Sequence, residues 1–397
     1  MTKLNRLAEE LSQHLQENIL PFWINRMQDG QGGFIGRISG DEGLDPEAPR
    51  GAILYSRILW SFSAAYREFH RSEYLDLATK AKQWLLKNFY DAEYGGVYWM
   101  VDPFGRPLDT HKQFYALGFA IYGLSEYSRA TGDRETLEYA IRLYHSIEQH
   151  AFDPILGGYI EATERDWRPR ADMRLSLKDD NAPKSMNTHL HILEPYTNLY
   201  RIWPDDDLRK ALIRMIELFL QRIEIPETHH LGLFFEDDWQ IVHPGVVSFG
   251  HDIEASWLLL EAAMAVNEPS LTERVKQHTR MIAEAALEGY FPDGSLAYER
   301  DAKGALDRER HWWVQAECVV GLTWLAVFHD IPDALEKAQK CWEYIKTHLV
   351  DLEYGEWFWS IREDGSINRD EDKAGFWKCP YHNSRMCLEV VNCARIK

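Results

Sequence analysis

A segment that begins with glycine recurs six times along the chain, and this repeat limits the possible folds more than any other feature. In most copies the glycine is followed by β-forming and aromatic residues. The copies begin at Gly32, Gly95, Gly157, Gly232, Gly294 and Gly355. Successive glycines are 61 to 63 residues apart, except for one interval of 75. A nearly fixed period is typical of folds assembled from repeated supersecondary units.

Two helical segments lie between consecutive glycine segments. The first of each pair is apolar on several faces, as in helices that are buried nearly all round. These segments span 51–69, 110–131, 185–203, 248–266, 310–329 and 380–396. The second segments are amphipathic and span 72–89, 134–150, 206–224, 269–289 and 332–349. A helix over about 3–27 supplies the sixth amphipathic partner if the chain closes on itself.

This alternation predicts an all-α fold, an (α/α)6 barrel of six inner and six outer helices. Short β-hairpins are expected at one mouth, where outer helices lead into inner helices. An open solenoid is the alternative, but it requires polar caps at both ends, and the final helix is apolar over Met386–Val391. No Pro/Ser-rich linker divides the chain, so we expect one catalytic domain over residues 1–397.

Composition excludes several classes of partner. The formal net charge is −19, which argues against nucleic acid and against an acidic polymer. The five cysteines are odd in number and have no CxxC spacing, which favours a reduced protein without a thiolate zinc site. No run of about 18 apolar residues is present, and residues 1–10 resemble an amphipathic helix start rather than a signal peptide. We therefore expect a cytoplasmic protein that does not bind membranes.

Polar residues occur where the inner helices begin, although those helices are otherwise apolar. His251 and Glu254 are three residues apart and share one helix face, which is costly unless the pair is used. The alternative is a capping arrangement in which Ser248 or Asp252 satisfies the first amides. The other helix starts contribute Arg57, Tyr115, Asn187, His189, His191, Trp312, Trp313, Glu317, Trp377, Tyr381, His382 and Arg385. Because these starts meet at one mouth of the predicted barrel, we expect them to form one site.

Aromatic residues among His, Glu, Asn and Arg favour a sugar as the ligand, since rings stack on pyranose faces while polar groups bond hydroxyls. A glycoside hydrolase would need a pair of carboxylates. The grouped histidines instead suit proton transfer beside a carbonyl, because their ordinary pKa lies near neutrality. A metal site is not expected, since His189 and His191 are two residues apart and point to different sides of a helix.

Five segments closely resemble the cellobiose 2-epimerases of the N-acylglucosamine 2-epimerase superfamily. The likeness covers nearly the whole chain in order. The segments are Arg50–Leu54, Ser185–His191, Ser248–Trp257, His311–Trp313 and Phe376–Asn383. The resemblance implies an (α/α)6 barrel that epimerises C2 of a reducing-end sugar without metal or cofactor.

The resemblance also implies roles for individual residues. His251 and His382 match the catalytic pair, which would remove the C2 proton from the ring-opened aldose and return it to the other face of a cis-enediolate. His191 matches a third histidine for ring opening or for the C1 oxygen, and Arg57 would bond the enediolate oxygens. Glu254 is expected to tune His251. The matched substrate-binding positions are Tyr115, Asn187, Trp313 and Trp377, and Glu317 is given a supporting role.

Three positions depart from this pattern, because Tyr55 stands where Asn is usual, and Gln113 and Leu117 where His and Gln are usual. The departures are either drift around the site or a preference for free mannose over a β-1,4-linked disaccharide. The related alternatives are a mannose 2-epimerase, an N-acylglucosamine 2-epimerase and an aldose–ketose isomerase. A glycoside hydrolase on the same barrel and a non-catalytic sugar-binding module are alternatives of a different class. A monomer and a homodimer both fit the sequence.

Overall fold

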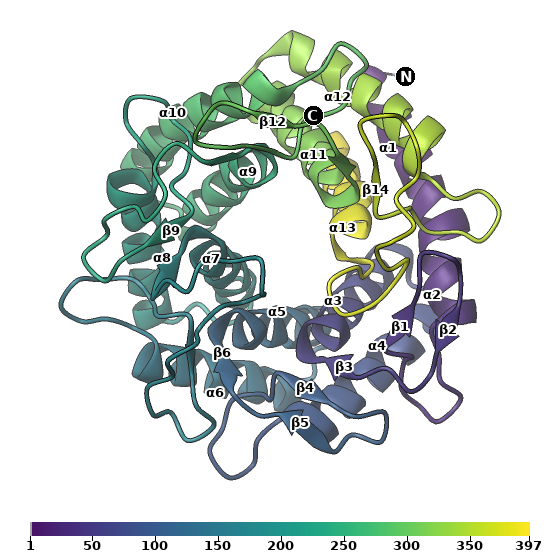
Figure 1. The fold of residues 1–397 in the computed structure, drawn as a ribbon, viewed down its shortest axis with the longest axis vertical. Helices are drawn as coiled ribbons and strands as arrows, with labels where there is room; N and C mark the ends of the chain where they lie inside the picture. The colour runs from purple at the N-terminus through teal and green to yellow at the C-terminus, as the bar shows by residue number, and fades with distance from the viewer. Residues whose placement is uncertain (1) are drawn as a thin grey trace.

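The computed structural model describes residues 2–397, and over this range the chain forms a closed ring of helices. Figure 1 looks down the axis of the ring and shows one circle of helices around the centre and a second circle outside it. The colour advances once around the ring, from the purple N-terminal helices to the yellow C-terminal helix. The predicted all-α barrel of six inner and six outer helices is confirmed over the described residues.

The inner helices contact one another in a circle, so each is buried between two inner neighbours and an outer layer. The inner helices are α3 (Ala52–Phe69), α5 (Phe114–Thr131), α7 (Met186–Tyr200), α9 (Phe249–Val266), α11 (Trp312–Phe328) and α13 (Tyr381–Ile396). The outer helices are α1 (Lys3–His14) with α2 (Leu20–Arg26), α4 (Ser72–Trp84), α6 (Arg134–His150), α8 (Asp206–Leu218), α10 (Pro269–Ala286) and α12 (Pro332–Tyr344).

Most outer α-helices are followed directly by a short segment of a different helix type. Five-residue π-helical turns join α1 to α2 and extend α4, α8 and α12, and a 3-10 turn extends α10. Their bounds are η1 (Leu15–Ile19), η2 (Leu85–Phe89), η3 (Phe219–Ile223), η4 (Leu287–Gly289) and η5 (Ile345–Leu349).

Two inner helices differ from the predicted range by three or more residues at one end. Helix α5 begins at Phe114 rather than at 110, because the Asp109 carboxylate accepts hydrogen bonds from the backbone N–H and the ring of His111 and stabilises a turn there. Helix α7 ends at Tyr200 rather than at 203, because Pro204 disfavours helical geometry in the residue before it.

Short strands connect neighbouring repeats at one mouth of the ring. The strand that precedes an inner helix pairs with a strand of the next repeat, as in β3 with β4 and β13 with β14. The strands are β1 (Arg37–Ile38), β2 (Leu44–Asp45), β3 (Arg50–Gly51), β4 (Met100–Val101), β5 (Pro107–Asp109), β6 (Lys112–Gln113), β7 (Ala162–Thr163), β8 (Lys184–Ser185), β9 (Phe234–Phe235), β10 (Val247–Ser248), β11 (Glu299–Arg300), β12 (Leu306–Asp307), β13 (Arg310–His311) and β14 (Ser360–Ile361). An antiparallel bridge between Ile38 and Ala374 joins the sixth repeat to the first.

The first turns of most inner helices are bonded to the hairpin that precedes them. The side chain three residues after the first helical residue accepts the N–H of a hairpin residue. Such bonds join Tyr55 to Phe34 (2.7 Å), His189 to Tyr159 (2.8 Å), Asp252 to Leu231 (3.0 Å) and Gln315 to Leu296 (2.8 Å). In α5 the equivalent residue is Leu117, which has no polar group to offer Val97. These bonds fix the helix ends that face the mouth.

A buried ion pair recurs beneath the first three hairpins. It joins an aspartate that follows the outer helix to a cation two residues before the next inner helix. The pairs are Asp29–Arg50 (2.8 Å), Asp91–Lys112 (2.9 Å) and Asp153–Lys184 (2.9 Å). In the fourth repeat the two equivalent positions are Ile225 and Val247, which are apolar. The fourth repeat therefore lacks the ion pair that joins the end of the outer helix to the start of the next inner helix in the first three repeats.

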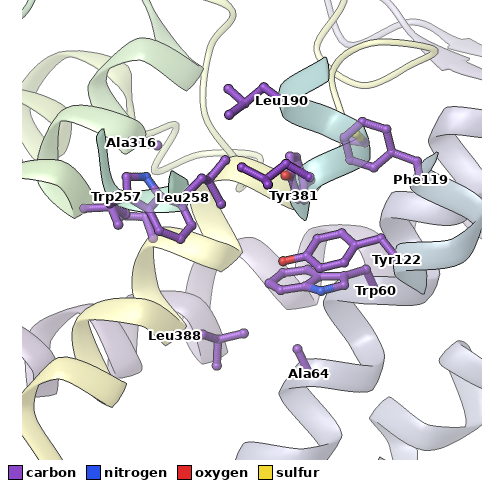
Figure 2. Packing of buried hydrophobic residues seen from close by; sticks show 14 of the residues in the cluster. Trp60, Ala64, Phe119, Tyr122, Leu190, Trp257, Leu258, Ala316, Tyr381 and Leu388 are labelled. Carbon is purple, nitrogen blue, oxygen red and sulfur yellow. The ribbon is translucent and has the colours of Figure 1, made fainter. Parts of the chain in front are cut away.

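The interior of the ring is filled largely by aromatic side chains. Trp60 stacks on Tyr122 with ring centroids 5.1 Å apart, and Figure 2 shows this pair beside Tyr381 and Phe119. Tyr381 meets Phe119 edge to face at 5.2 Å. This packing closes the centre of the ring beneath the mouth. Among the described residues no helix is both long and apolar enough to cross a membrane.

Candidate active site

A cavity of about 700 Å³ opens at the mouth that carries the hairpins. All six inner helices contribute to its wall. Nine of the ten residues to which the family resemblance gives a role line it: Arg57, Tyr115, Asn187, His191, His251, Glu254, Trp313, Trp377 and His382. The tenth, Glu317, lies behind His382 and bonds to it. The structure therefore brings these ten residues together. Of the other helix-start residues that were expected there, Trp312 lines the cavity, whereas His189, Tyr381 and Arg385 do not.

Arg385 lies beneath the cavity and binds three carboxylates from three other inner helices. It donates to Glu194 of α7, to Glu254 of α9 at 2.5 Å and to Glu317 of α11 at 2.7 Å. All four side chains are buried. A single guanidinium thus holds the helices that carry the site histidines in a fixed arrangement.

The charges of this cluster do not balance, and the carboxyl groups respond differently. Burial disfavours ionisation of Glu194, but the charge of Arg385 and the bond from His191 outweigh it, and the pKa of Glu194 falls to about 2. Burial and the charge of Glu317 raise the pKa of Glu254 well above its usual range. Burial also raises the pKa of Glu317, although Arg385 opposes this. Burial and mutual repulsion therefore favour the protonated form of Glu254 and Glu317 more than that of an exposed carboxyl group, whereas Glu194 favours the ionised form.

His382 is oriented by Glu317. Its Nδ1 lies 2.6 Å from Glu317 Oε1, which leaves Nε2 free to face the cavity. Burial and the positive charge of Arg385 lower the pKa of His382 well below its ordinary value. His382 is therefore a neutral imidazole with one nitrogen available to accept a proton.

His251 has a different partner from the one expected. Its Nδ1 lies 2.8 Å from the hydroxyl of Ser248, and burial lowers its pKa to about 3. The expectation that Glu254 tunes His251 is not met by a direct bond, because Glu254 Oε1 turns to Arg385 instead. The capping alternative also fails in detail, since Ser248 bonds the His251 ring, and Asp252 bonds His230 and the N–H of Leu231.

Trp313 lies between these two histidines. Its ring centroid is 4.8 Å from that of His251 and 5.6 Å from that of His382. The histidines come from α9 and α13, which are separated in the ring by α11. Both imidazoles therefore border the part of the cavity wall that the indole forms.

His191 and Arg57 complete the polar part of the wall. His191 Nδ1 lies 3.1 Å from Glu194 Oε2, and its Nε2 is 3.9 Å from Glu254 Oε2. Burial lowers the pKa of His191, although Glu194 opposes this. Arg57 donates to the Tyr115 hydroxyl at 2.9 Å and to the backbone oxygen of Trp377 at 3.4 Å. Arg57 thus brings a fixed positive charge to the cavity wall.

Glu254, Glu317 and His382 place ligand atoms within 4.8 Å of one another, as a metal site would require. The same carboxylates accept hydrogen bonds from Arg385, whose guanidinium already supplies the positive charge that their oxygens need. The donor set is therefore that of an ion-pair cluster. His189, the other candidate ligand, points away from the cavity and accepts the N–H of Tyr159 at 2.8 Å.

The three departures from the family pattern do not touch the cavity as described over residues 2–397. Tyr55 bonds Phe34, and Gln113 donates to the backbone oxygen of Met173 at 3.2 Å. Leu117 occupies the position that in other repeats bonds the hairpin. Tyr55 and Leu117 thus belong to the attachment of hairpin to helix, and the structure supports drift around the site at these two positions.

Sequence reasoning missed Glu194 and left Arg385 without a role. The available signal was spacing, since His191 and Glu194 repeat the His-x-x-Glu pattern of His251 and Glu254. The rim segment 175–179 was also missed. It lines the cavity, and its Lys178 pairs at 3.5 Å with Glu371, another residue of the cavity wall. Nothing in the helical period marks this segment, because it lies in a long loop between two strands.

Comparison with known proteins places this site in a family. The sequence profile of the family described as N-acylglucosamine 2-epimerase (GlcNAc 2-epimerase) matches residues 33–385. The chain is 55% identical to the cellobiose 2-epimerase of Bacteroides fragilis over 387 residues, which cover 97% of this chain and 98% of that protein. It is 39% identical to the cellobiose 2-epimerase of Dictyoglomus turgidum, covering 98% of this chain and 99% of that protein.

A solved structure agrees with these relatives. The cellobiose 2-epimerase from Bacillus thermoamylovorans B4167 superposes with a TM-score of 0.94 at 38% identity, covering 98% of this chain and 99% of that one. The match extends over the whole ring, including the elements that form the cavity. The chain therefore belongs to the N-acylglucosamine 2-epimerase family and is a carbohydrate 2-epimerase.

Proposed function

We propose that this enzyme interconverts glucose- and mannose-configured reducing-end sugars of β-1,4-linked disaccharides such as cellobiose, with His251 and His382 as the two proton-transfer groups. The observation that carries the proposal is that both imidazoles line the cavity beside Trp313 and come from the two inner helices that flank α11. Each is neutral, and each has Nδ1 engaged, by Ser248 or by Glu317. Epimerisation needs one such group on each face of the carbon.

The reaction begins with the opened aldehyde form of the sugar. One histidine takes the C2 proton, and the C2–H electron pair forms the C1=C2 double bond while the carbonyl electrons move to the C1 oxygen. The resulting enediolate is stabilised by Arg57, the fixed charge on the wall. The negative charge of the enediolate favours the imidazolium form of the second histidine, which takes up a proton from solvent. Rotation about C2–C3 turns the other face of C2 to this histidine, which gives that proton to C2 as the aldehyde re-forms, and the first histidine releases the original C2 proton to solvent.

His191 is suited to the ring-opening step. Its Nδ1 is held by Glu194, and its Nε2 faces Glu254, whose Oε2 has no hydrogen-bond partner within residues 2–397. Because the pKa of Glu254 is raised, its carboxyl can hold a proton near this imidazole. The pair can therefore exchange a proton with the sugar oxygen that is released when the ring opens. These steps use only proton transfer by side chains of the chain itself.

The size of the cavity supports a disaccharide. At about 700 Å³ it lies in the upper part of the usual range of about 300–1,000 Å³ for small-molecule sites. Trp377 and Trp359 extend the aromatic wall towards the rim. A second sugar ring therefore has both room and a stacking surface. The same enzyme acting chiefly on free mannose is the alternative that substrate comparison would reveal.

Incubation with cellobiose, glucose and mannose in D2O, followed by NMR, tests the proposal. We expect fastest conversion of cellobiose, with deuterium entering at C2. Entry at C1 with a ketose product would identify an isomerase instead, and release of free glucose from cellobiose would identify a hydrolase. His251→Asn and His382→Asn should each abolish inversion while sugar binding persists, which a non-catalytic binding protein would not show.

We further propose that residues 1–397 act as one catalytic domain in the cytoplasm, as a monomer or a homodimer. All five cysteines are buried free thiols, which is consistent with a reducing compartment. Size-exclusion chromatography with light scattering would distinguish the two oligomeric states.

A further inference from the structure

The hairpins of the six repeats share one position whose residue type divides the repeats into two groups. In every repeat an antiparallel bridge joins the residue after the outer helix to a residue of the hairpin. The shared position is the residue just before the bridged hairpin residue. From the first repeat to the sixth it holds Gly33, Gly96, Gly158, His230, Ser295 and Glu356. The first three repeats thus have glycine, whereas only the fourth and the sixth have an ionisable side chain.

The glycines are required by what surrounds them. A Cβ on Gly33 would lie 2.7 Å from the carboxylate of Asp29, and a Cβ on Gly158 would lie 2.4 Å from the Trp239 ring. Asp29 belongs to the buried ion pair of its repeat. In the fourth repeat Ile225 and Val247 stand at the positions of the ion pair, and His230 stands at the position of these glycines.

His230 uses that space to reach the inner helix. Its Nδ1 lies 2.7 Å from Asp252 Oδ2, and its Nε2 is 3.4 Å from Glu288 and 3.2 Å from Arg300 Nη2. The other oxygen of Asp252 accepts the N–H of Leu231 at 3.0 Å. His230 and Asp252 are both buried. The bond therefore fixes the residue that directly follows His251.

Glu356 makes the corresponding contact in the sixth repeat. Its Oε1 accepts Nδ2 of Asn383 at 2.6 Å and Nζ of Lys378 at 2.8 Å, and its Oε2 accepts Nε1 of Trp23 at 2.7 Å. Asn383 directly follows His382. Glu356 keeps the left-handed backbone of the glycine it replaces, with φ +63°. A side chain that persists in this strained conformation has a compensating interaction, and here that interaction is with the start of α13.

We propose that His230 and Glu356 are positioning residues, one for each proton-transfer histidine. Each reaches from the hairpin to the residue after its histidine and fixes the first turn of the helix that aims the imidazole at C2. This inference rests on the proposed roles of His251 and His382. The third repeat provides the internal comparison, because its helix carries His191, which transfers no C2 proton, and its hairpin has Gly158.

The test replaces His230 and Glu356 by glycine, the residue at this position in the first three repeats. His230→Gly should lower kcat by up to about 100-fold, because a displacement of about 1 Å in a reacting group can cost that much, and KM should stay within about twofold. His230→Asn should recover most of the loss, since its amide nitrogen can take the place of Nδ1 opposite Asp252. Ser295→Gly makes the same change in the fifth repeat and should leave kcat unchanged. Equal kcat losses in His230→Gly and Ser295→Gly, or no recovery in His230→Asn, would overturn the proposal.

Glu356→Gly alone would leave the buried ammonium of Lys378 without its partner, so the informative variant is Glu356→Gly with Lys378→Met. The reference is Glu356→Gln with Lys378→Met, which keeps an acceptor for Asn383 and leaves no unpaired buried charge. We expect kcat to fall in the Glu356→Gly double variant and to remain near the parent value in the Glu356→Gln double variant. Equal activity of the two double variants would overturn the role of Glu356.

Deuterium exchange separates this inference from the proposed function. Exchange at C2 without inversion needs only the histidine on one face. His230→Gly should suppress such exchange from one epimer, and the Glu356→Gly/Lys378→Met variant should suppress it from the other. Equal suppression from both epimers would overturn the pairing of positioning residue with histidine. Retention of epimerisation by His251→Asn or His382→Asn would instead overturn the proposed function itself.

Discussion

Glu317 Oε1 lies 2.6 Å from Nδ1 of His382, and the same oxygen accepts a hydrogen bond from Arg385 at 2.7 Å. The carboxylate thus selects the tautomer in which Nε2 of His382 is unprotonated and faces the cavity. It also connects the histidine to the ion-pair cluster beneath the site. Glu317 is outside the wall of the cavity, so it affects the reaction through His382 and not through the sugar.

Glu317→Gln should therefore lower kcat by about 10- to 100-fold, the usual effect of removing a partner that orients a reactive imidazole, with KM little changed. Steady-state kinetics on cellobiose would measure both constants. Glu126→Gln is the matched control, because Glu126 is a buried carboxylate of inner helix α5 that pairs with Arg67 away from the cavity. A rise in KM without loss of kcat would contradict the positioning role.

Arg385→Met should destabilise the protein strongly at neutral pH. It leaves Glu194, Glu254 and Glu317 buried without their shared cation, and breaking a buried ion pair in this way typically costs about 3–5 kcal/mol. Unpaired buried carboxyl groups have raised pKa values, so the variant should regain stability as the pH falls and they become protonated. Urea unfolding at pH 7.5 and pH 5 would show this; an equal stability deficit at both pH values would contradict it.

Acid should destabilise the unmodified enzyme for a different reason. Burial lowers the pKa of His14 and His189 to about 4 and that of His251 to about 3. Their ordinary pKa is near 6.5, so below that value the unfolded chain binds more protons than the folded one. Their contribution to stability is complete above pH 6.5 and is lost as the pH falls towards 4 and 3.

In melting temperatures measured from pH 8 to pH 4, these histidines should therefore contribute no pH dependence above pH 6.5 and a decline below it. His189→Asn serves as the test of cause, because its amide oxygen can accept the Tyr159 N–H without titrating. It should make the decline shallower. An unchanged slope in His189→Asn would show that the acid sensitivity arises elsewhere.

The ring of helices could be predicted from the sequence because the features that indicate it, the apolar faces of each helix and the period of the repeats, are visible without knowledge of tertiary contacts. Each inner helix is apolar on several faces and each outer helix on one, and the period is nearly constant, so element type and order follow without knowledge of contacts. The helix ends were less accurate where a side chain formed a turn, as Asp109 does before α5. The site was predicted for a related reason, since residues at equivalent helix starts must converge once the ring closes.

The partners within the site could not be predicted in the same way. Glu254 was assigned to His251 because they are neighbours on one helix face, yet its bond is to Arg385, which lies 131 residues further along the chain. Such a partner depends on how the inner helices pack against one another. The hydrophobic period of a single helix does not predict that packing. The His-x-x-Glu spacing marked the residues but not their contacts.

Leu117→Gln tests the interpretation of the departures from the family pattern. In α11 the equivalent Gln315 accepts the N–H of Leu296 with Oε1 and donates to its backbone oxygen with Nε2, both at 2.8 Å. A glutamine at 117 can bond Val97 in the same way, and two buried hydrogen bonds of this kind should raise the free energy of unfolding by about 1–2 kcal/mol.

Because Leu117 does not line the cavity as described over residues 2–397, the substitution should leave the ratio of kcat/KM for cellobiose and mannose unchanged. Urea unfolding and kinetics on both sugars would measure the two effects. A shift of the ratio towards cellobiose without added stability would mean that residue 117 governs substrate choice. Added stability with an unchanged ratio would confirm that residue 117 acts in the attachment of hairpin to helix and not in substrate choice.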